Sequence, residues 1–215
     1  MTPLLQAWEN TCAVATNSFV LPDGCQDLIG VQLPNEKPRW FIASLSDQLY
    51  KVRSAANLRY MGYRFVPGTN FDNAELLKQM EEADLDDKAY SQITINNCAC
   101  IDPRISEALN ALACEATIKA ARQQLGVNER TLQRLLSNST GRTAAYWKRL
   151  ARWRLAARKL ANDTRTPLVE IAADHGYFDQ AHMNLEFRRW LGISPSTFQN
   201  NSALCRLAND SGFGT

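Results

Sequence analysis

Hydrophobic and polar positions follow a strand-like pattern early in the chain. From Thr11 to Phe71, short runs of β-branched and aromatic residues are separated by segments rich in proline, glycine and asparagine. One such turn, Pro22-Asp23-Gly24, precedes Cys25 and a further strand. Imperfect alternation between Leu58 and Phe65 predicts a strand with one buried face and a β-bulge at Met61-Gly62. The pattern therefore predicts a small sheet.

The spacing of apolar residues becomes helical after Phe71. Two groups recur three to five positions apart, Ala74, Leu77, Met80 and Leu85, and then, behind Asp102-Pro103, Ile105, Leu109 and Leu112. These segments predict helices that either cover the sheet or pair two chains.

The second half of the chain contains an internal repeat. A shift of 50 residues aligns Gly126 with Gly176, and after one inserted residue a shift of 51 aligns the apolar positions. The aligned pairs are Leu132 with Met183, Leu136 with Phe187, Gly141 with Gly192, Thr143 with Ser194 and Trp147 with Phe198. Each copy predicts a helix, a turn with glycine at positive φ, and a second helix capped by Asn128 or Asp179. Each copy is therefore predicted to be a helix-turn-helix.

A single helix is expected between the copies, from about Thr143 to Asn162. Thr166-Pro167 is expected to cap and begin the next helix. Apolar residues at Tyr146, Leu150, Trp153, Ala157 and Leu160 form one stripe, and cations that include Arg152, Arg154 and Arg158 occupy other faces, where they suit a solvated surface, ion pairs or an anionic partner. Twenty residues at 1.5 Å each give about 30 Å, close to the roughly 34 Å repeat of a DNA turn. Such a connector would place two recognition helices in successive major-groove segments.

Charge divides the chain at the same place. Residues 1–115 hold nine Lys and Arg against 15 Asp and Glu, whereas residues 116–199 hold 14 against six, within a net charge of +2 for 215 residues. A basic C-terminal part predicts a polyanionic partner. The longest uncharged stretch, Trp190–Cys205, is too short and polar to span a membrane, and the amino terminus lacks the pattern of a secretory signal. We therefore expect a cytoplasmic protein with no membrane partner.

The composition offers little for catalysis or metal binding. The N-terminal half has no histidine and no glycine-rich phosphate loop, and the only histidines are His175 and His182. The six cysteines lack zinc-binding spacing, so we expect reduced thiols that pack as small hydrophobic groups. The sequence thus predicts no enzyme, no cofactor and no metal site.

At three places the C-terminal half resembles the DNA-binding domain of the AraC/XylS transcription regulators. The matching stretches are GVNERTLQRLL, RWRLAARKL and VEIAADHGYFDQAHMNLEFRRWLGISPSTF. The resemblance implies two helix-turn-helix units joined by one helix, with no metal or cofactor in that domain. Upstream, VLPDGCQDLIG and MGYRFVPG resemble a short β-rich domain that precedes this module in one subgroup of the family.

The resemblance also implies which residues read DNA. In the first copy, the base-reading positions of the family fall on Arg130, Gln133 and Arg134. Arginine grips guanine O6 and N7 with two hydrogen bonds, and glutamine pairs with adenine. Arg122 departs from the repeat, because Ala172 faces the recognition helix in the second copy; its side chain either loosens the first unit or extends to solvent.

The second copy departs further from the family. Its base-reading positions fall on Gln180, Ala181, Asn184 and Leu185, and late in the same helix Arg188 and Arg189 are candidates for phosphate contact. The family commonly has arginine where Leu185 stands, and leucine contacts only an apolar group such as the thymine methyl. We therefore expect more polar base reading from the first unit and more phosphate anchoring from the second.

The predicted fold class is α+β with two domains and a tail. Residues 1–115 form a small β-rich domain with flanking helices, 116–200 an all-α domain of two helix-turn-helix units joined by a linker helix, and 201–215 a flexible tail. The predicted function is a sequence-specific transcription regulator controlled through its N-terminal domain, with double-stranded DNA as partner. RNA polymerase, a small-molecule or protein effector at the N-terminal domain, and a second copy of the chain are left open as partners.

Another class also stays open. A DNA-repair methyl-acceptor protein can carry the same DNA-binding module, but it would need four zinc-binding cysteines near the start, where only Cys12 and Cys25 stand.

Overall fold

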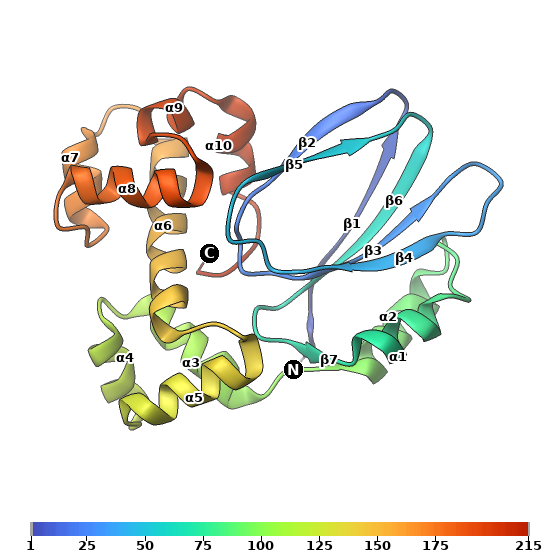
Figure 1. Ribbon diagram of the computed structural model, residues 1–215, viewed down its shortest axis with the longest axis horizontal. Coiled ribbons are helices and arrows are strands. Elements are labelled where there is room, and N and C mark those ends of the chain that lie inside the picture. Colours follow the sequence, from blue (N-terminus) through green and yellow to red (C-terminus); the bar gives the residue numbers. More distant parts are fainter. Residues whose placement is uncertain (1, 215) are drawn as a thin grey trace. The chain divides into compact units, whose positions relative to one another are not determined.

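The computed structural model describes residues 2–214 of an α+β protein, drawn in Figure 1. The chain divides into two compact units. The first comprises residues 1–18, 25–45 and 51–106, and the second comprises residues 19–24, 46–50 and 107–215. Two short stretches of the N-terminal half thus belong to the helical unit. The divisions at 115 and 200 expected from the sequence stay predictions.

All the strands except β8 precede the helices along the chain. They are β1 (Leu4–Cys12), β2 (Thr16–Val20), β3 (Asp27–Gln32), β4 (Arg39–Ala43), β5 (Tyr50–Ser54), β6 (Leu58–Phe65), β7 (Asn70–Phe71) and β8 (Ala99–Cys100). The helices are α1 (Asn73–Met80), α2 (Lys88–Cys98), α3 (Pro103–Cys114), α4 (Ile118–Leu125), α5 (Glu129–Thr140), α6 (Ala144–Asn162), α7 (Leu168–Asp174), α8 (Gln180–Leu191), α9 (Pro195–Gln199) and α10 (Ser202–Ala208). Within residues 2–214, no helix has the length and hydropathy that a membrane crossing requires.

The first unit is built on an antiparallel four-stranded sheet in the order β1-β6-β3-β4. Tyr63 and Phe65 of β6 and Leu28 of β3 are buried on one face, where they pack in one cluster with residues of α1 and α2 such as Leu76 and Ile95. The helices α1 and α2 therefore cover the sheet. This confirms one of the two alternatives for the predicted segment at residues 74–85, whereas α2 was not predicted and the segment at residues 105–112 is α3, which does not belong to this cluster. Figure 1 shows α1 and α2 along one side of the strands.

The prediction of a β-bulge at Met61-Gly62 is wrong. β6 pairs in regular register through both residues, and the irregularity lies instead in β1, between Leu4 and Gln6. Gly62 is required for a different reason, because a Cβ there would lie 1.9 Å from Cε2 of Trp8 on the neighbouring strand. The glycine lets the indole lie flat across the sheet.

The sheet also begins earlier than the hydrophobic pattern indicates, at Leu4 rather than near Thr11. β1 is an edge strand whose residues are mostly exposed, so its sequence shows little apolar alternation. The signal that reveals a half-buried strand is weak in a strand of this kind.

In the second unit, the 19-residue helix α6 is the central element, close to the predicted span. It contacts α4, α5, α7, α9 and α10. Trp147 and Trp153 of α6 and Trp190 of α8 are at most 1% exposed and form the centre of the core. At about 1.5 Å per residue, α6 is about 28 Å long.

The repeat is confirmed in the local geometry of both copies. Gly126 and Gly176 have φ values of 64° and 69°, which glycine adopts without a Cβ penalty. Asn128 and Asp179 cap α5 and α8 by accepting hydrogen bonds from Thr131 N and His182 N. The aligned pair Thr143 and Ser194 likewise caps α6 and α9, by accepting from Tyr146 N and Thr197 N.

The start of α7 differs from the prediction. Pro167 is the N-cap, without a side-chain cap hydrogen bond, and Thr166 instead donates its hydroxyl to Asp163 at 2.8 Å. Asp163 also accepts from the backbone N–H groups of Arg165 and Thr166 and pairs with Lys159. These donors, Lys159 first, hold the pKa of Asp163 well below its ordinary value. The carboxylate thus organises the turn that the hydroxyl was expected to cap.

The segment after residue 200, expected to be a flexible tail, contains an ordered helix. Leu204 and Ala208 of α10 are buried, and α10 contacts α6. Phe213 is 4% exposed and meets Trp147 edge to face at 4.8 Å between ring centroids. Its N–H donates to Asp23 O at 2.8 Å. The apolar residues in this polar stretch are therefore part of the core.

Candidate nucleic-acid interface

The first recognition helix, α5, presents two arginines to solvent. Arg130 and Arg134 lie one turn apart and are exposed, while Leu132 and Leu136 on the opposite side are at most 1% exposed. Within residues 2–214, neither guanidinium lies within 4.0 Å of a carboxylate oxygen. The helix α5 therefore has an apolar side that packs in the core and a cationic side that faces solvent.

Gln133 lies beside these arginines but is half-buried. Its Nε2 donates to Ser137 Oγ at 3.0 Å, and its Oε1 accepts from Ala144 N at 3.5 Å. The amide therefore also links α5 to the start of α6. The sequence pattern gave no sign of this second role.

The side chain of Arg122 makes an ion pair within the first unit. Its Nη1 lies 3.1 Å from Oε2 of Glu129, at the first residue of α5. Where the second copy has the small Ala172, the first copy thus has an ion pair between α4 and α5.

The second recognition helix, α8, presents a different surface. Its exposed positions are Ala181, Leu185, Arg188 and Arg189, whereas Gln180 and Asn184 are half-buried. In the repeat, Ala181 and Leu185 occupy the places of Arg130 and Arg134. Four of the expected site residues therefore divide into two exposed cations and two partly covered amides.

The turn before α8 contains the residue that was inserted between the copies. Val127 N donates to Arg122 O at 3.1 Å, and Tyr177 N donates to Ala172 O at 3.0 Å, so these two turns correspond. The additional residue is Phe178, which is 93% exposed. Its N–H donates to Nδ1 of His182 at 3.3 Å, which holds the backbone against the first turn of α8.

A buried ion pair joins α8 to α6. The guanidinium of Arg149 makes two hydrogen bonds to Glu186, one of them from Nε to Oε2 at 3.1 Å. The side chain of Glu186 is 7% exposed and that of Arg149 is 32% exposed. Leu135 holds the equivalent place in the first copy, so the repeat gives no sign of this pair and the sequence does not predict it.

Other cations of α6 also bind backbone carbonyls of the helical unit itself. Arg152 donates to Gly176 O at 2.8 Å and lies 5.1 Å from the ring centroid of Tyr177, so it supports the turn of the second unit. Arg154 is 2% exposed and donates to Asp210 O. Lys148 donates to the carbonyls of Leu112, in the last turn of α3, and of Glu115, directly after that helix. Burial lowers the pKa of Lys148.

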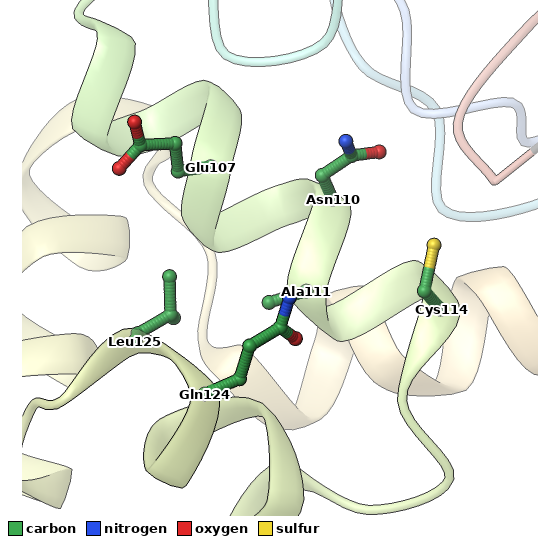
Figure 2. Close-up of a pocket in the computed structure, with 6 residues that line it drawn as sticks. All are labelled: Glu107, Asn110, Ala111, Cys114, Gln124 and Leu125. Carbon is green, nitrogen blue, oxygen red and sulfur yellow. The ribbon is translucent and has the colours of Figure 1, made fainter.

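An open cavity of about 370 Å³ lies between α3 and α4. Figure 2 shows its lining, which consists of Glu107, Asn110, Ala111 and Cys114 from α3 and Gln124 and Leu125 from α4. The polar groups of this lining are one carboxylate, one thiol and two amides. Over residues 2–214, no group of three or more His, Cys, Asp or Glu side chains is placed to hold a metal ion, so the zinc site of the methyl-acceptor alternative has no counterpart in that part.

Comparison with known proteins identifies the helical unit. Residues 122–201 match a family model described as a helix-turn-helix domain. No curated protein matches the chain.

Among solved structures, the chain is similar to the DNA-binding domain of AdpA, a global transcriptional factor, in complex with a target DNA. The two share 23% identity over 46% of this chain and 87% of the other, with a TM-score of 0.38. ToxT from Vibrio cholerae O395 shares 9% identity over 91% of this chain and 96% of the other, with a TM-score of 0.45.

The matched residues contain the end of α4, both recognition helices, the linker helix between them and the caps that repeat from one copy to the next. Residues 122–201 are therefore an AraC-type helix-turn-helix domain, a DNA-binding module of transcription regulators.

Proposed function

We propose that the protein recognises specific promoter sequences with two recognition helices, α5 and α8, placed by the linker helix α6. The observation that carries this proposal is the repeated helix-turn-helix with the exposed pair Arg130 and Arg134 on α5. A rigid connector of about 28 Å approaches the roughly 34 Å repeat of B-DNA. Two such helices suit successive major-groove segments on one face of a duplex.

In the first unit, the proposed roles follow from the chemistry of the side chains. Arg130 and Arg134 would each grip a guanine through O6 and N7. Gln133 would offer its amide to an adenine, and it would first have to give up its hydrogen bonds to Ser137 and Ala144. We therefore assign most of the polar base reading to the two arginines.

In the second unit, Arg188 and Arg189 are exposed on the last turns of α8 and suit phosphate contact. Gln180 and Asn184 are proposed to contact base edges, although both are half-buried. Phosphate contacts fix the register of the protein on DNA without sequence information.

We further propose that the N-terminal half controls the DNA-binding unit. Residues 46–50 belong to that unit, where Asp47 pairs with Arg142 between α5 and α6, with distances of 3.0 and 3.1 Å. Leu49 N donates to Trp190 O at the end of α8, at 2.8 Å. One short segment thus contacts both helix-turn-helix units, so a change in it would reach both recognition helices. An effector or a second copy of the chain would act through such a segment.

The experiment that tests base reading compares two arginine variants. We expect Arg134→Ala to weaken binding to a specific promoter fragment by about 1 to 3 kcal/mol, which is about 5- to 150-fold. Arg206→Ala, which removes an exposed cation from α10, is the matched control and should bind like the wild type at the same salt concentration. Equal affinity of Arg134→Ala and wild type would refute the proposed role of α5.

A further inference from the structure

The second recognition helix presents an apolar surface where the first presents cations. Leu185 is 64% exposed, and Ala181 lies one turn before it on the same face of α8. Phe178, three residues before Ala181, is 93% exposed and is the residue inserted between the copies. A partner that fits this surface has an apolar group to contact the exposed phenylalanine and leucine, and anionic groups beside it to contact the cations of the helix.

The charges around this surface indicate which occupant fits. Arg188 and Arg189 follow Leu185 by three and four residues, so both border it on the helix. The one carboxylate within α8, Glu186, is buried against Arg149. The exposed part of α8 therefore combines apolar side chains with two cations, and the exposed carboxylate nearest to them, Asp179, is the N-cap of the helix and accepts from His182 N. This combination suits the DNA major groove, where the C5 methyl of thymine is the apolar group between phosphate backbones.

We infer that the second helix-turn-helix reads C5-methyl groups of pyrimidines through Phe178, Ala181 and Leu185. This inference rests on the proposed function and specifies the chemistry of one of its two reading surfaces. The two halves of the operator then differ in kind. The half read by α5 requires hydrogen-bonding purine edges, and the half read by α8 requires methyl groups.

The backbone around the insertion supports this role. The hydrogen bond from Phe178 N to His182 Nδ1 fixes the aromatic residue at the start of α8, and Asp179 caps the helix directly behind it. Arg152 holds the turn on the inner side through Gly176 O. The apolar surface is thus carried on a fixed turn and helix, as a reading surface requires.

The test begins with an operator selected from random duplex DNA by the full-length chain. Binding of Arg134→Ala assigns the half that α5 reads, and thymines in the other half are then replaced one at a time by deoxyuridine. This replacement removes only the C5 methyl and keeps the hydrogen-bonding groups of the base. A buried methyl-sized group contributes about 0.8 kcal/mol, so we expect about a fourfold loss for each methyl that the protein contacts.

The same DNA series is measured with Leu185→Ala and Phe178→Ala. Both variants should bind the thymine operator more weakly than wild type and should lose sensitivity to deoxyuridine at one or more positions. Leu155→Ala, which removes a leucine 39% exposed on α6, is the matched control and should keep the wild-type sensitivity. Because all three side chains are exposed, unchanged thermal midpoints should confirm that the variants fold.

Three results would overturn the inference. The first is that the operator half assigned to α8 contains no thymine. The second is that replacing its thymines by deoxyuridine does not change the affinity. The third is that Leu185→Ala and Phe178→Ala both keep the wild-type sensitivity to this replacement. In each case the protein still selects a specific operator, so the proposed function stands. Failure to select any operator refutes the proposed function, and the inference falls with it.

Discussion

The ion pair between Arg149 and Glu186 provides a quantitative test of how the second recognition helix is held. Removing one partner of a buried pair costs about 3–5 kcal/mol when the charge left behind stays buried. Here the two partners differ, because the side chain of Glu186 is 7% exposed and that of Arg149 is 32% exposed. The two single substitutions should therefore have unequal costs.

We predict that Arg149→Met destabilises the protein by about 3 kcal/mol, since it leaves the carboxylate of Glu186 without a partner in the interior. Glu186→Leu should cost about 1 kcal/mol, because the remaining guanidinium can reach water and the first copy has Leu135 at the same place. The double variant should recover to within about 1 kcal/mol of wild type, because an apolar replacement of both partners is often neutral.

Urea unfolding followed by tryptophan fluorescence measures these differences, since Trp153 of α6 and Trp190 of α8 are buried against each other. Arg158→Met removes a half-buried cation from the same helix and is the control, with an expected change below about 0.5 kcal/mol. The reasoning is refuted if Glu186→Leu is as costly as Arg149→Met, or if the double variant is no more stable than Arg149→Met.

Three further predictions concern other parts of the fold. Phe213→Ala should cost about 3 kcal/mol in urea unfolding, because it empties the site against Trp147, and a loss below about 1 kcal/mol would show that this segment is not part of the core. Asp163→Asn should lower the thermal midpoint at pH 7. Because the pKa of Asp163 is lowered in the folded state, the stabilisation by its carboxylate is lost as the pH falls below about 4. The difference in thermal midpoint between variant and wild type should therefore shrink towards pH 2, and a difference that is independent of pH would contradict this. Gly62→Ala should reduce the stability of the sheet because of the Trp8 indole, and the added Trp8→Ala substitution should reduce that penalty when the same variants are compared by thermal unfolding.

The two recognition helices and the linker helix could be predicted from the sequence together with their N-caps, whereas the cap of α7 could not. Their signals are local, namely glycine at positive φ, capping residues and apolar spacing, and each occurs twice at a fixed offset. The positions Asn128 and Asp179 followed directly from that duplication. Signals of this kind can be recognised in a single sequence, because they depend only on residues that are close along the chain.

What could not be predicted depends on contacts between distant residues. Nothing near Glu186 in the sequence points to Arg149, 37 residues away, and nothing near Gly62 points to the indole of Trp8. The ordered helix α10 was likewise hidden, because its two buried side chains, Leu204 and Ala208, stand in a polar stretch. The roles of these side chains depend on tertiary contacts, and a pattern of residues along the chain does not show which distant residues are in contact.

The central claim, that one chain reads DNA with two recognition helices, is tested most directly by the sequence motif that the protein selects from random duplexes. The account predicts two conserved blocks with centres about one helical turn apart. Arg134→Ala should weaken the base preference at one or more positions of one block, and Leu185→Ala should do so in the other. A single block, or binding that depends only on salt concentration and not on sequence, would contradict the claim.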